Sequence, residues 1–397
     1  MSLAHHAAPA AAAARPVLDR LGLLIALVAG AGLALPFATL AANRIVPGEG
    51  FMLLAALPGP PGWLLTGLAG AGIVTALLRF SPTLKLIMGF VLLAALCFLI
   101  GVAAETLTPA DNDYARVAPA AGFWLLVFAF TLMVADALTR LRFGPWARLS
   151  LLVATALALG GLLASGRLDA LSVLQEYAGR APAFWQEART HLLLAFGSVA
   201  VAALVGIPLG IVCHRVRRVR ATILNALNVI QTIPSIALFG LLIAPLAWVA
   251  ANVPGAAAIG ISGIGTAPAM LALFAYSLLP LAANTVVGLA GVPAPAVDAA
   301  RGMGMTGRQR LWGVELPLAF PVILTGIRIV LVQNIGLATI AALIGGGGFG
   351  VFVFQGIGQT AMDLVLLGAL PTVALAFAAA VVLDALVELA ERRGRRA

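Results

Sequence analysis

Charged side chains are scarce in this chain of 397 residues. Only 10% of the residues are Asp, Glu, Lys or Arg, and 62% are hydrophobic, whereas a soluble domain carries about 25% charged residues. This shortage excludes an ordinary soluble enzyme or binding domain. A membrane-spanning helix needs about 20 mostly apolar residues, so the length is better counted in spans than in soluble domains.

Lysine and cysteine are nearly absent as well. Lys85 is the single lysine, and the formal net charge of +9 comes from arginines in small clusters between apolar runs. A nucleic-acid-binding surface would gather them on one face, so we expect no nucleic-acid partner. The two cysteines, Cys97 and Cys213, lie in or at the end of apolar runs and predict no disulfide or metal site. No set of His, Asp and Glu has the spacing of metal ligands, and we expect no cofactor.

Ten apolar segments fill most of the chain. Backbone groups in lipid must be hydrogen-bonded within their own segment, so each apolar segment is predicted to be a helix. The alternation of apolar and polar residues that is typical of outer-membrane barrel strands is absent from the sequence, which argues against a barrel. The segments are 21–42, 63–78, 86–104, 120–138, 148–165, 191–213, 222–250, 267–291, 320–344 and 361–389. The first lacks a convincing cleavage site and is predicted to be a retained helix, not a signal peptide.

The basic residues lie mainly on one side of these spans, as the positive-inside rule describes. With the N-terminus in the cytoplasm, 18 of the 24 lysines and arginines fall in inside stretches and five in outside stretches, while Arg328 falls within a span. The inside residues are Arg15, Arg20, Arg79, Lys85, Arg140, Arg142, Arg148, Arg215, Arg217, Arg218, Arg220, Arg301, Arg308, Arg310, Arg392, Arg393, Arg395 and Arg396. The sequence therefore predicts a multi-pass inner-membrane protein with both termini in the cytoplasm.

A polar interruption at residues 166–190 divides the chain into two halves of five spans each. It is predicted to be an external linker with some amphipathic helix. The spans before it are poor in motifs, whereas those after it are rich in Pro, Gly, Asn and Gln, which in membranes line a path or a helix contact. The predicted parts are a cytoplasmic tail (1–20), an N-terminal five-helix extension (21–165), the linker (166–190), a five-span core (191–390) and a basic cytoplasmic tail (391–397).

The loop between the eighth and ninth spans carries the most specific pattern. It reads Ala-Val-Asp-Ala-Ala-Arg-Gly-Met-Gly over 296–304 and ends in Val-Glu-Leu-Pro over 314–317. The residues that carry the pattern are Asp298, Ala299, Ala300, Gly304, Leu316 and Pro317. They resemble the EAA loop of ABC importer permeases, with Asp298 at the position where that family has Glu. The resemblance implies that this loop docks a separate ATPase subunit.

The loop also suits docking on physical grounds. Pro295 and Asp298 can start a short helix, because an acid is favoured near a helix N-terminus, and Gly304 can end it in the left-handed conformation. The two alanines let a partner approach closely. A second short helix is predicted through residues 309–312, running to Pro317, which restarts the chain into the membrane. Apolar side chains are then left at the surface, namely Met303, Met305, Leu311 and Trp312.

The chain has no nucleotide-binding loop of the form G-x-x-x-x-G-K-[ST]. The glycine run at 345–348 has no lysine after it and falls on the predicted outer side. ATP hydrolysis is therefore expected in a partner subunit, and the chain is expected to have no catalytic residues of its own.

Residues from about 191 to 390 resemble the permeases of osmoprotectant importers, which carry glycine betaine, choline or carnitine. The segments that carry the resemblance are Gly206–Gly210, Gln231–Leu238, Tyr276–Pro280 with Asn284–Thr285, the 296–317 loop, Gly326–Arg328 and Gly345–Gly350. This implies an all-α, polytopic transmembrane bundle of about ten spans with a five-span type I importer core, in the long form that has an N-terminal membrane extension. It also implies two ATPase copies, an external substrate-binding protein and a second permease subunit, identical or different.

Polar residues and one proline in the later spans are candidates for a translocation path or gate. They are Gln231, Thr232, Pro234, Ser235, Asn284, Arg328 and Asn334. Asn and Gln also hydrogen-bond between helices, so both roles stay open for them. Pro234 is expected to kink the seventh span, as a hinge, as a gate or for packing alone. Arg328 is expected to snorkel to the cytoplasmic face or to pair with an acid across the bundle, and Asp136 and Asp384 to be solvated or salt-bridged.

Other classes fit the sequence less well. Gly260–Gly263 resembles the tetrapeptide of rhomboid-type serine proteases, but that chemistry needs a histidine base on a later span and all four histidines precede Ser262. A secondary transporter would show acids within its spans and internal repeats, and here such acids are scarce and no repeat is visible. A permease for methionine or another amino acid remains the alternative within the importer class.

Overall fold

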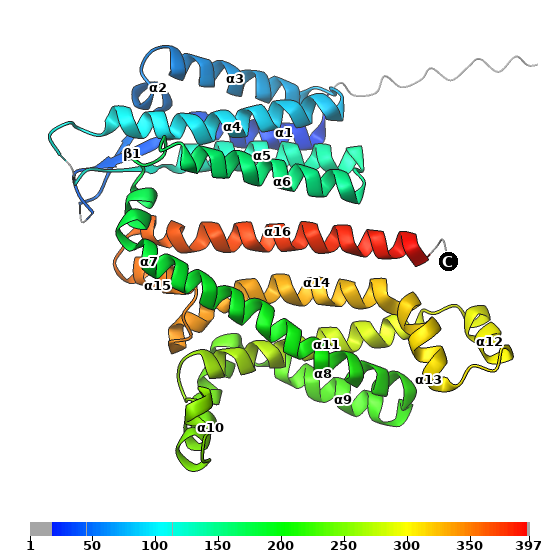
Figure 1. Ribbon diagram of the computed structural model, residues 1–397. Helices are drawn as coiled ribbons and strands as arrows, with labels where there is room; N and C mark the ends of the chain where they lie inside the picture. Colours follow the sequence, from blue (N-terminus) through cyan, green and yellow to red (C-terminus); the bar gives the residue numbers. More distant parts are fainter. Residues whose placement is uncertain (1–17, 45, 113, 395–397) are drawn as a thin grey trace, which may run out of the picture. The chain divides into compact units, whose positions relative to one another are not determined.

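The computed structural model describes residues 18–44, 46–112 and 114–394, mostly as helices (Figure 1). Backbone contacts group the chain into two compact units, residues 1–142 with 166–171 and residues 143–165 with 172–397. Most of the predicted tail at 1–20 and the last three residues of the tail at 391–397 lie outside the described residues. Within them, nine helices are long and apolar enough to cross a membrane, in keeping with a polytopic helical bundle.

The first unit is a bundle of four helices with one further short helix. The helices are α1 (Arg20–Leu33), α2 (Leu53–Ala56), α3 (Pro60–Leu77), α4 (Pro82–Leu107) and α5 (Ala121–Leu141). Glycines let these helices approach closely: a Cβ on Gly22 of α1 would lie 1.9 Å from the carbonyl oxygen of Ala76 on α3. Small residues serve the same purpose in membrane helix pairs.

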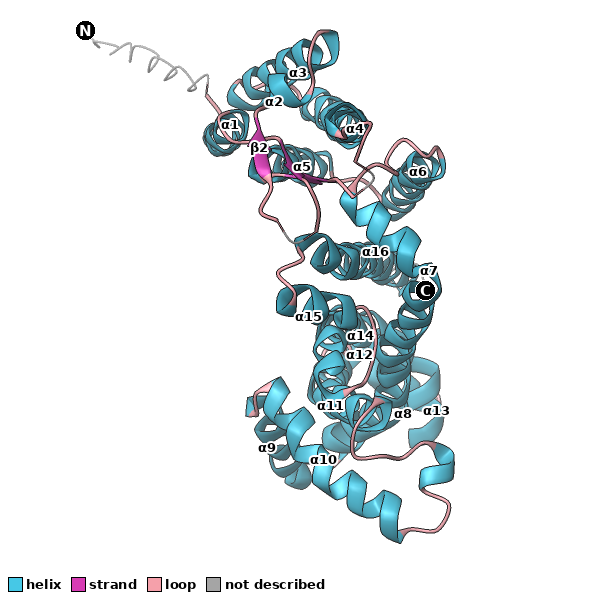
Figure 2. Ribbon diagram, turned by 90° about the vertical axis from the view of Figure 1, so that its left-hand side faces the viewer, coloured by secondary structure: helices cyan, strands magenta, loops and turns pink. Residues whose placement is uncertain are grey.

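A three-stranded antiparallel sheet stands at the end of this bundle where α4 ends and α5 begins (Figure 2). Its order is β2 (Glu49–Phe51), β1 (Ala38–Ala41), β3 (Arg116–Pro119). The expected first span at 21–42 is therefore wrong in extent, because α1 has 14 residues and a helix of that length measures about 21 Å. Pro36 disfavours helix at the residue before it, and the chain enters β1 instead.

A cluster of charges, buried at Asp19 and Lys85 and exposed at Arg140, joins the helices at the opposite end of the first unit. The ammonium of Lys85 lies 2.8 Å from Oδ2 of Asp19, and a guanidinium nitrogen of Arg140 lies 3.0 Å from the same oxygen. Lys85 also donates to the carbonyl of Ala76 at 3.1 Å, and Arg140 pairs with Asp136 at 2.8 Å. The cluster joins the ends of α1, α3, α4 and α5, and it shows Asp136 to be salt-bridged.

The second unit is also helical. Its elements are α6 (Pro145–Ala164), α7 (Ser172–Leu192), α8 (Ser198–Arg215), α9 (Arg217–Thr232), α10 (Ser235–Asn252), α11 (Thr266–Ala290), α12 (Ala294–Gly302), α13 (Gly307–Arg310), α14 (Leu316–Ile340), α15 (Gly350–Gly358) and α16 (Met362–Gly394). The helix α6, expected in the N-terminal extension, packs against α16 and belongs to this unit. One turn of π-helix, Leu193–Gly197, joins α7 to α8, so the helix of the sixth span begins well before residue 191.

The helices α8, α11 and α14 form the centre of the second unit (Figure 1). Leu194, Leu273, Ile335 and Ala338 are fully buried among them. Asn334 of α14 is fully buried too, and its amide nitrogen donates to Ser198 Oγ at 2.8 Å and to Ser277 Oγ at 2.9 Å. These bonds hold the three helices to one another where their backbones come close.

Candidate functional site

The span expected at 222–250 consists of two helices. The first, α9, ends at Thr232 and the second, α10, begins at Ser235 and turns away from it (Figure 1). Pro234 has no amide hydrogen and disfavours helix at Ile233. The expected kink is therefore a complete break, and it leaves the Ile233 carbonyl free of helical hydrogen bonding.

Tyr276 of α11 closes this break. Its hydroxyl donates to the Ile233 carbonyl, and the side-chain amide of Gln231 donates to the Tyr276 carbonyl at 2.7 Å. The break is thus tied to α11 in both directions, by a backbone acceptor on each side. Thr232 instead bonds within its own helix, to the Val229 carbonyl at 2.7 Å.

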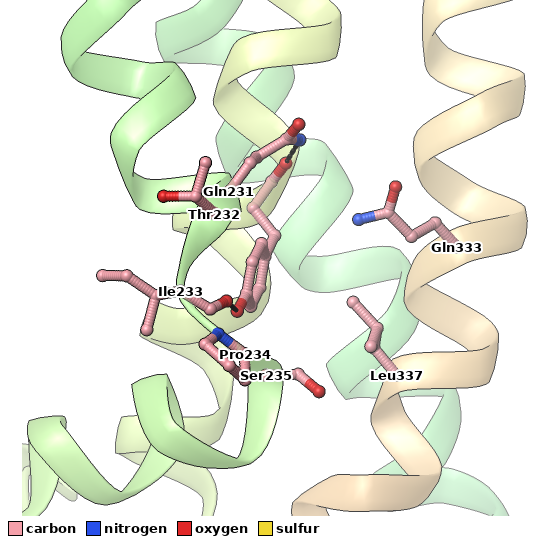
Figure 3. Close-up of a pocket in the computed structure, with 8 residues that line it drawn as sticks. Gln231, Thr232, Ile233, Pro234, Ser235, Gln333 and Leu337 are labelled. Atoms are coloured by element: carbon pink, nitrogen blue, oxygen red, sulfur yellow. Dashed lines mark hydrogen bonds between the residues drawn. The ribbon is translucent and has the colours of Figure 1, made fainter.

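A hollow of about 390 Å³ lies beside the break (Figure 3). It is lined by Gln231, Thr232, Ile233, Pro234, Ser235, Tyr276, Gln333 and Leu337. The side chain of Gln333 extends from α14 toward the Gln231–Ser235 segment (Figure 3). Neither the Gln333 amide nor the Ser235 hydroxyl has a hydrogen-bond partner among the described residues, so both are available to a ligand. Four of the seven predicted path residues meet here.

A second hollow, of about 580 Å³, adjoins the first. It is lined by Arg328, Ile329, Val332, Gln333, Ala380, Val381 and Asp384. Gln333 belongs to both hollows. Together they follow α14 from Leu337, near its C-terminal end, back to Arg328.

The first expectation for Arg328 was that its side chain would snorkel to the cytoplasmic face, and the structure does not show this. Arg328 pairs with Asp384 of α16, which is the second of the two expectations. Asp384 is accordingly salt-bridged, and Arg148 of α6 holds its other oxygen.

The two remaining predicted path residues line neither hollow. Asn284 bonds within its own helix, to the Pro280 carbonyl at 2.8 Å, and its side chain packs where Gly326 lets α14 approach. Asn334 is buried in the polar contacts among α8, α11 and α14. Asn284 thus fills the contact between α11 and α14, and Asn334 joins α8, α11 and α14 by hydrogen bonds.

The predicted docking loop folds as two short helices at the end of α14. Gly304 has φ +78 and ends the α12 segment in the left-handed conformation, as its sequence position suggested. Asp298 and Ala299 are exposed, whereas Ala300 is 1% exposed and faces its own chain. Met303 and Trp312 are 75% and 65% exposed, so an apolar surface is presented there. Leu316 and Pro317 start α14 without interrupting the helix, through a π-helical turn at Leu311–Glu315.

Glu315 fixes this loop to the membrane helices. One of its oxygens lies 2.8 Å from Arg215 at the end of α8, and the other lies 2.7 Å from Arg310 of α13. The Glu315 side chain is only 7% exposed. A buried carboxylate with an arginine on each oxygen is satisfied and rigidly placed.

Three residues of these sites were absent from the sequence-based candidates: Tyr276, Gln333 and Glu315. Tyr276 and Glu315 act through contacts with residues that lie 43 and 100 positions away, which spacing along the chain does not reveal. The signal for Glu315 was the acid in the Val-Glu-Leu-Pro end of the loop. For Gln333, the only signal in the sequence was that a polar residue lies within an apolar span.

Comparison with known proteins follows the two parts of the chain. Residues 206–396 match the family "Binding-protein-dependent transport system inner membrane component", and residues 19–174 match "ABC transporter permease YehY, N-terminal domain". A comparison with solved structures gives the inward-facing MetNI methionine ABC transporter, at TM-score 0.47 and 21% identity over 52% of this chain and 96% of that one.

Curated relatives match about half of the chain and most of their own length. The choline transport system permease protein OpuBB of Bacillus subtilis is 37% identical over 51% of this chain and 84% of its own. The osmoprotectant import permease proteins OsmW and OsmY of Salmonella typhimurium are 43% and 40% identical, over 79% and 78% of their lengths. By these relatives and by its apolar helices, the chain belongs to the osmoprotectant permeases of ABC importers, which are multi-pass inner-membrane proteins.

Proposed function

We propose that this permease subunit imports a small osmoprotectant of the glycine betaine type along α14, using ATP hydrolysed by a separate subunit. The observation that carries the proposal is the pair of hollows that meet at Gln333. Each hollow has polar side chains within an otherwise apolar bundle, and Gln333 lines both of them. In membrane proteins such residues mark substrate pathways.

The 296–317 loop supports the proposal that a separate ATPase subunit supplies the energy for transport. Membership of the family implies an ATPase partner and a substrate-binding protein. The exposed Met303 and Trp312 offer an apolar contact to the ATPase, and Gly304 gives the loop its turn. The complex holds two ATPase copies and a second permease subunit, of the same or a different chain, and this subunit has no catalytic residues of its own.

The break between α9 and α10 serves as the gate of this route. Two hydrogen bonds hold the break against α11 in the closed state of the gate: Tyr276 donates to the Ile233 carbonyl, and Gln231 donates to the Tyr276 carbonyl. Because these bonds reach backbone atoms, they can be exchanged for bonds to a ligand or to water without leaving a charge unpaired. Opening them would let α10 move against α11 and connect the first hollow with the outer side.

The arrangement in the membrane follows from the charges. Both termini and the docking loop lie in the cytoplasm, and the first unit's sheet lies outside. The parts of the chain are a cytoplasmic tail (1–20), an extension (21–165), an external linker (166–190), the permease core (191–390) and a basic tail (391–397). Membrane lipid is the surrounding partner, and the role in transport belongs to the core.

Stimulation of the partner ATPase tests the substrate and the coupling together. The chain is reconstituted with an ATPase subunit and a substrate-binding protein of an osmoprotectant importer, and ATP hydrolysis is measured with the binding protein loaded or empty. Glycine betaine is expected to stimulate hydrolysis and methionine to leave it at the basal rate. Stimulation by methionine but not by glycine betaine would assign the chain to amino-acid import instead.

A further inference from the structure

The second hollow combines an ion pair with apolar walls. Arg328 on α14 pairs with Oδ1 of Asp384 on α16, and the two side chains are 36% and 41% exposed. The walls beside them are aliphatic: Ile329, Val332, Ala380 and Val381. A positive group, a negative group and methyl-rich surface therefore share one hollow of about 580 Å³.

The two partners of this ion pair are not equally committed to it. Asp384 has a second arginine, because Arg148 of α6 pairs with its Oδ2 atom and also with Glu388. Among the described residues, Arg328 makes a single ion pair, the one with Asp384. Both side chains are partly exposed, so solvent lowers the cost of breaking the pair, and the cost that remains depends on which charge is left without a partner. If Arg328 turns to a ligand, Asp384 keeps Arg148, so Arg328 is the member that can be exchanged.

The chemistry of Arg328 determines what can take the place of Asp384. A guanidinium binds a carboxylate through two parallel hydrogen bonds, so the replacement is a ligand carboxylate. A ligand that also carries a quaternary ammonium stays neutral overall, and its methyl groups suit the aliphatic walls, where burying them is favourable. The negative charge of Asp384 lies on the α16 side of the hollow, toward which the ammonium would point.

We propose that this hollow is a binding station for a zwitterion that carries a carboxylate and a quaternary ammonium. The inference rests on the proposed function and names the substrate class of the route along α14. Glycine betaine and carnitine have this chemistry. Choline has the quaternary ammonium but no carboxylate. Because it cannot replace Asp384 as the partner of Arg328, choline is not expected to bind in this hollow.

Protection of a cysteine reporter from labelling tests this directly on the purified full-length chain in lipid nanodiscs. Val332→Cys places a thiol on the wall of the hollow, with Cys97→Ser and Cys213→Ala removing the native thiols. Labelling by a small thiosulfonate reagent is timed with glycine betaine, with choline chloride or with sodium chloride. The matched control is Val373→Cys, on an exposed position of α16 that lines neither hollow.

Glycine betaine is expected to slow labelling of the cysteine at 332 about tenfold when its concentration is about ten times its dissociation constant, since only free sites react. Choline is expected to leave the labelling rate of the cysteine at 332 unchanged. Neither compound is expected to change the labelling rate of the control cysteine at 373. Equal protection by choline and glycine betaine would overturn the proposal, and so would the absence of protection by glycine betaine.

Two further variants separate ligand binding from the holding of α14 to α16. Arg328→Gln removes the group that binds the carboxylate and is expected to abolish protection. Asp384→Asn frees Arg328 from its competitor and is expected to preserve protection or to lower the concentration needed. Equal loss in both variants would mean that the pair only joins the helices, and the proposal would fail.

Transport by the reporter protein distinguishes this failure from a failure of the proposed function. If the reporter protein imports glycine betaine with ATP but the ligand never protects the cysteine at 332, the binding station is refuted and the permease function stands. If the reconstituted wild-type complex shows no ATP-dependent import, the proposed function itself has failed, and the binding station fails with it.

Discussion

Glu315 joins three parts of the second unit through one carboxylate. Its two oxygens hold the end of α8 and the helix α13 at 2.8 and 2.7 Å, while Met303 and Trp312, on either side of α13, form the proposed docking surface. A displacement of the 296–317 loop would therefore be transmitted to α8 through the Glu315 side chain. At the scale of single residues, we therefore propose Glu315 as a positioning residue for coupling.

Replacing Glu315 by glutamine is expected to uncouple transport from ATP hydrolysis. Glutamine keeps one acceptor oxygen and turns its amide nitrogen, a donor, toward the second arginine, so one of the two charge-assisted hydrogen bonds is lost, and such bonds contribute about 1.5–3 kcal/mol each. The ATPase is expected to co-purify and hydrolyse ATP, while uptake per ATP falls. Glu105→Gln is the control, because its pair with Arg167 is exposed and 3.9 Å long. An unchanged ratio of uptake to hydrolysis in Glu315→Gln would contradict this role.

The cluster of Asp19, Lys85 and Arg140 makes a second prediction at this scale. Removing one partner of a buried ion pair costs about 3–5 kcal/mol, and the Lys85 and Asp19 side chains are only 4% and 10% exposed. Lys85→Met is therefore expected to lower the unfolding temperature of the detergent-purified chain. The control is Arg20→Met, at an exposed position, where surface changes stay within about 0.5 kcal/mol. Equal melting of the two variants would contradict the prediction.

The same cluster predicts a loss of stability in acid. Burial by itself raises the pKa of Asp19, but the hydrogen bond and charge of Lys85, with the charge of Arg140, outweigh it and hold the pKa below its ordinary value of 3.8. A lowered pKa in the folded state adds stability above the unfolded value, near pH 4, and this stability is lost as the pH falls through the folded value. Melting in Asp19→Asn is expected to change less with acid than in the wild type, and a parallel decline would count against the ion cluster.

At the scale of elements, the break between α9 and α10 is the feature on which the proposed gate depends. Pro234 keeps the two helices apart, and Tyr276 occupies the carbonyl that the break leaves free. Two helices joined by a break can change their angle, whereas one continuous helix resists it.

Pro234→Ala is expected to favour a continuous helix from α9 into α10 and to slow transport. Proline inside a helix costs about 3 kcal/mol relative to alanine, so its loss removes the penalty that enforces the break. Pro245→Ala is the matched control, because Pro245 lies within α10 itself. Uptake rates of the two variants are compared at equal membrane levels. If Pro245→Ala alone slowed uptake, the gate would not lie at the break.

Elements were predictable from the sequence to different degrees. The long apolar helices follow from composition, since a run of about 20 apolar residues has few alternatives in lipid. The left-handed turn at Gly304 follows from its place after a short helix. The end of α1 at Leu33 was missed because residues 34–42 are nearly as apolar as the helix, although Pro36 stops it. Contacts such as Tyr276 with Ile233 depend on how distant helices pack, and no local pattern encodes them.

At the scale of the whole molecule, coupling to a cytoplasmic ATPase requires the 296–317 loop to face the cytoplasm. Met303→Cys and Ile259→Cys report on the two sides, because both side chains are exposed, at 75% and 79%. In a background without Cys97 and Cys213, an impermeant thiol reagent is expected to label the cysteine at 259 in intact cells. It is expected to label the cysteine at 303 only in inverted vesicles. The reverse pattern would place the docking loop outside and contradict an ATPase partner.

The central claim is that this chain moves an osmoprotectant with energy taken from a separate ATPase through the loop at Gly304. The most direct measurement is uptake of radiolabelled glycine betaine into proteoliposomes that hold the chain, its ATPase and its binding protein. Uptake is expected to require ATP and to be abolished by Gly304→Val, because a branched side chain is strained at φ +78. Gly302→Ala, which meets nothing within 4 Å, is expected to transport normally. Uptake driven by an ion gradient without ATP, or normal uptake by Gly304→Val, would contradict the account.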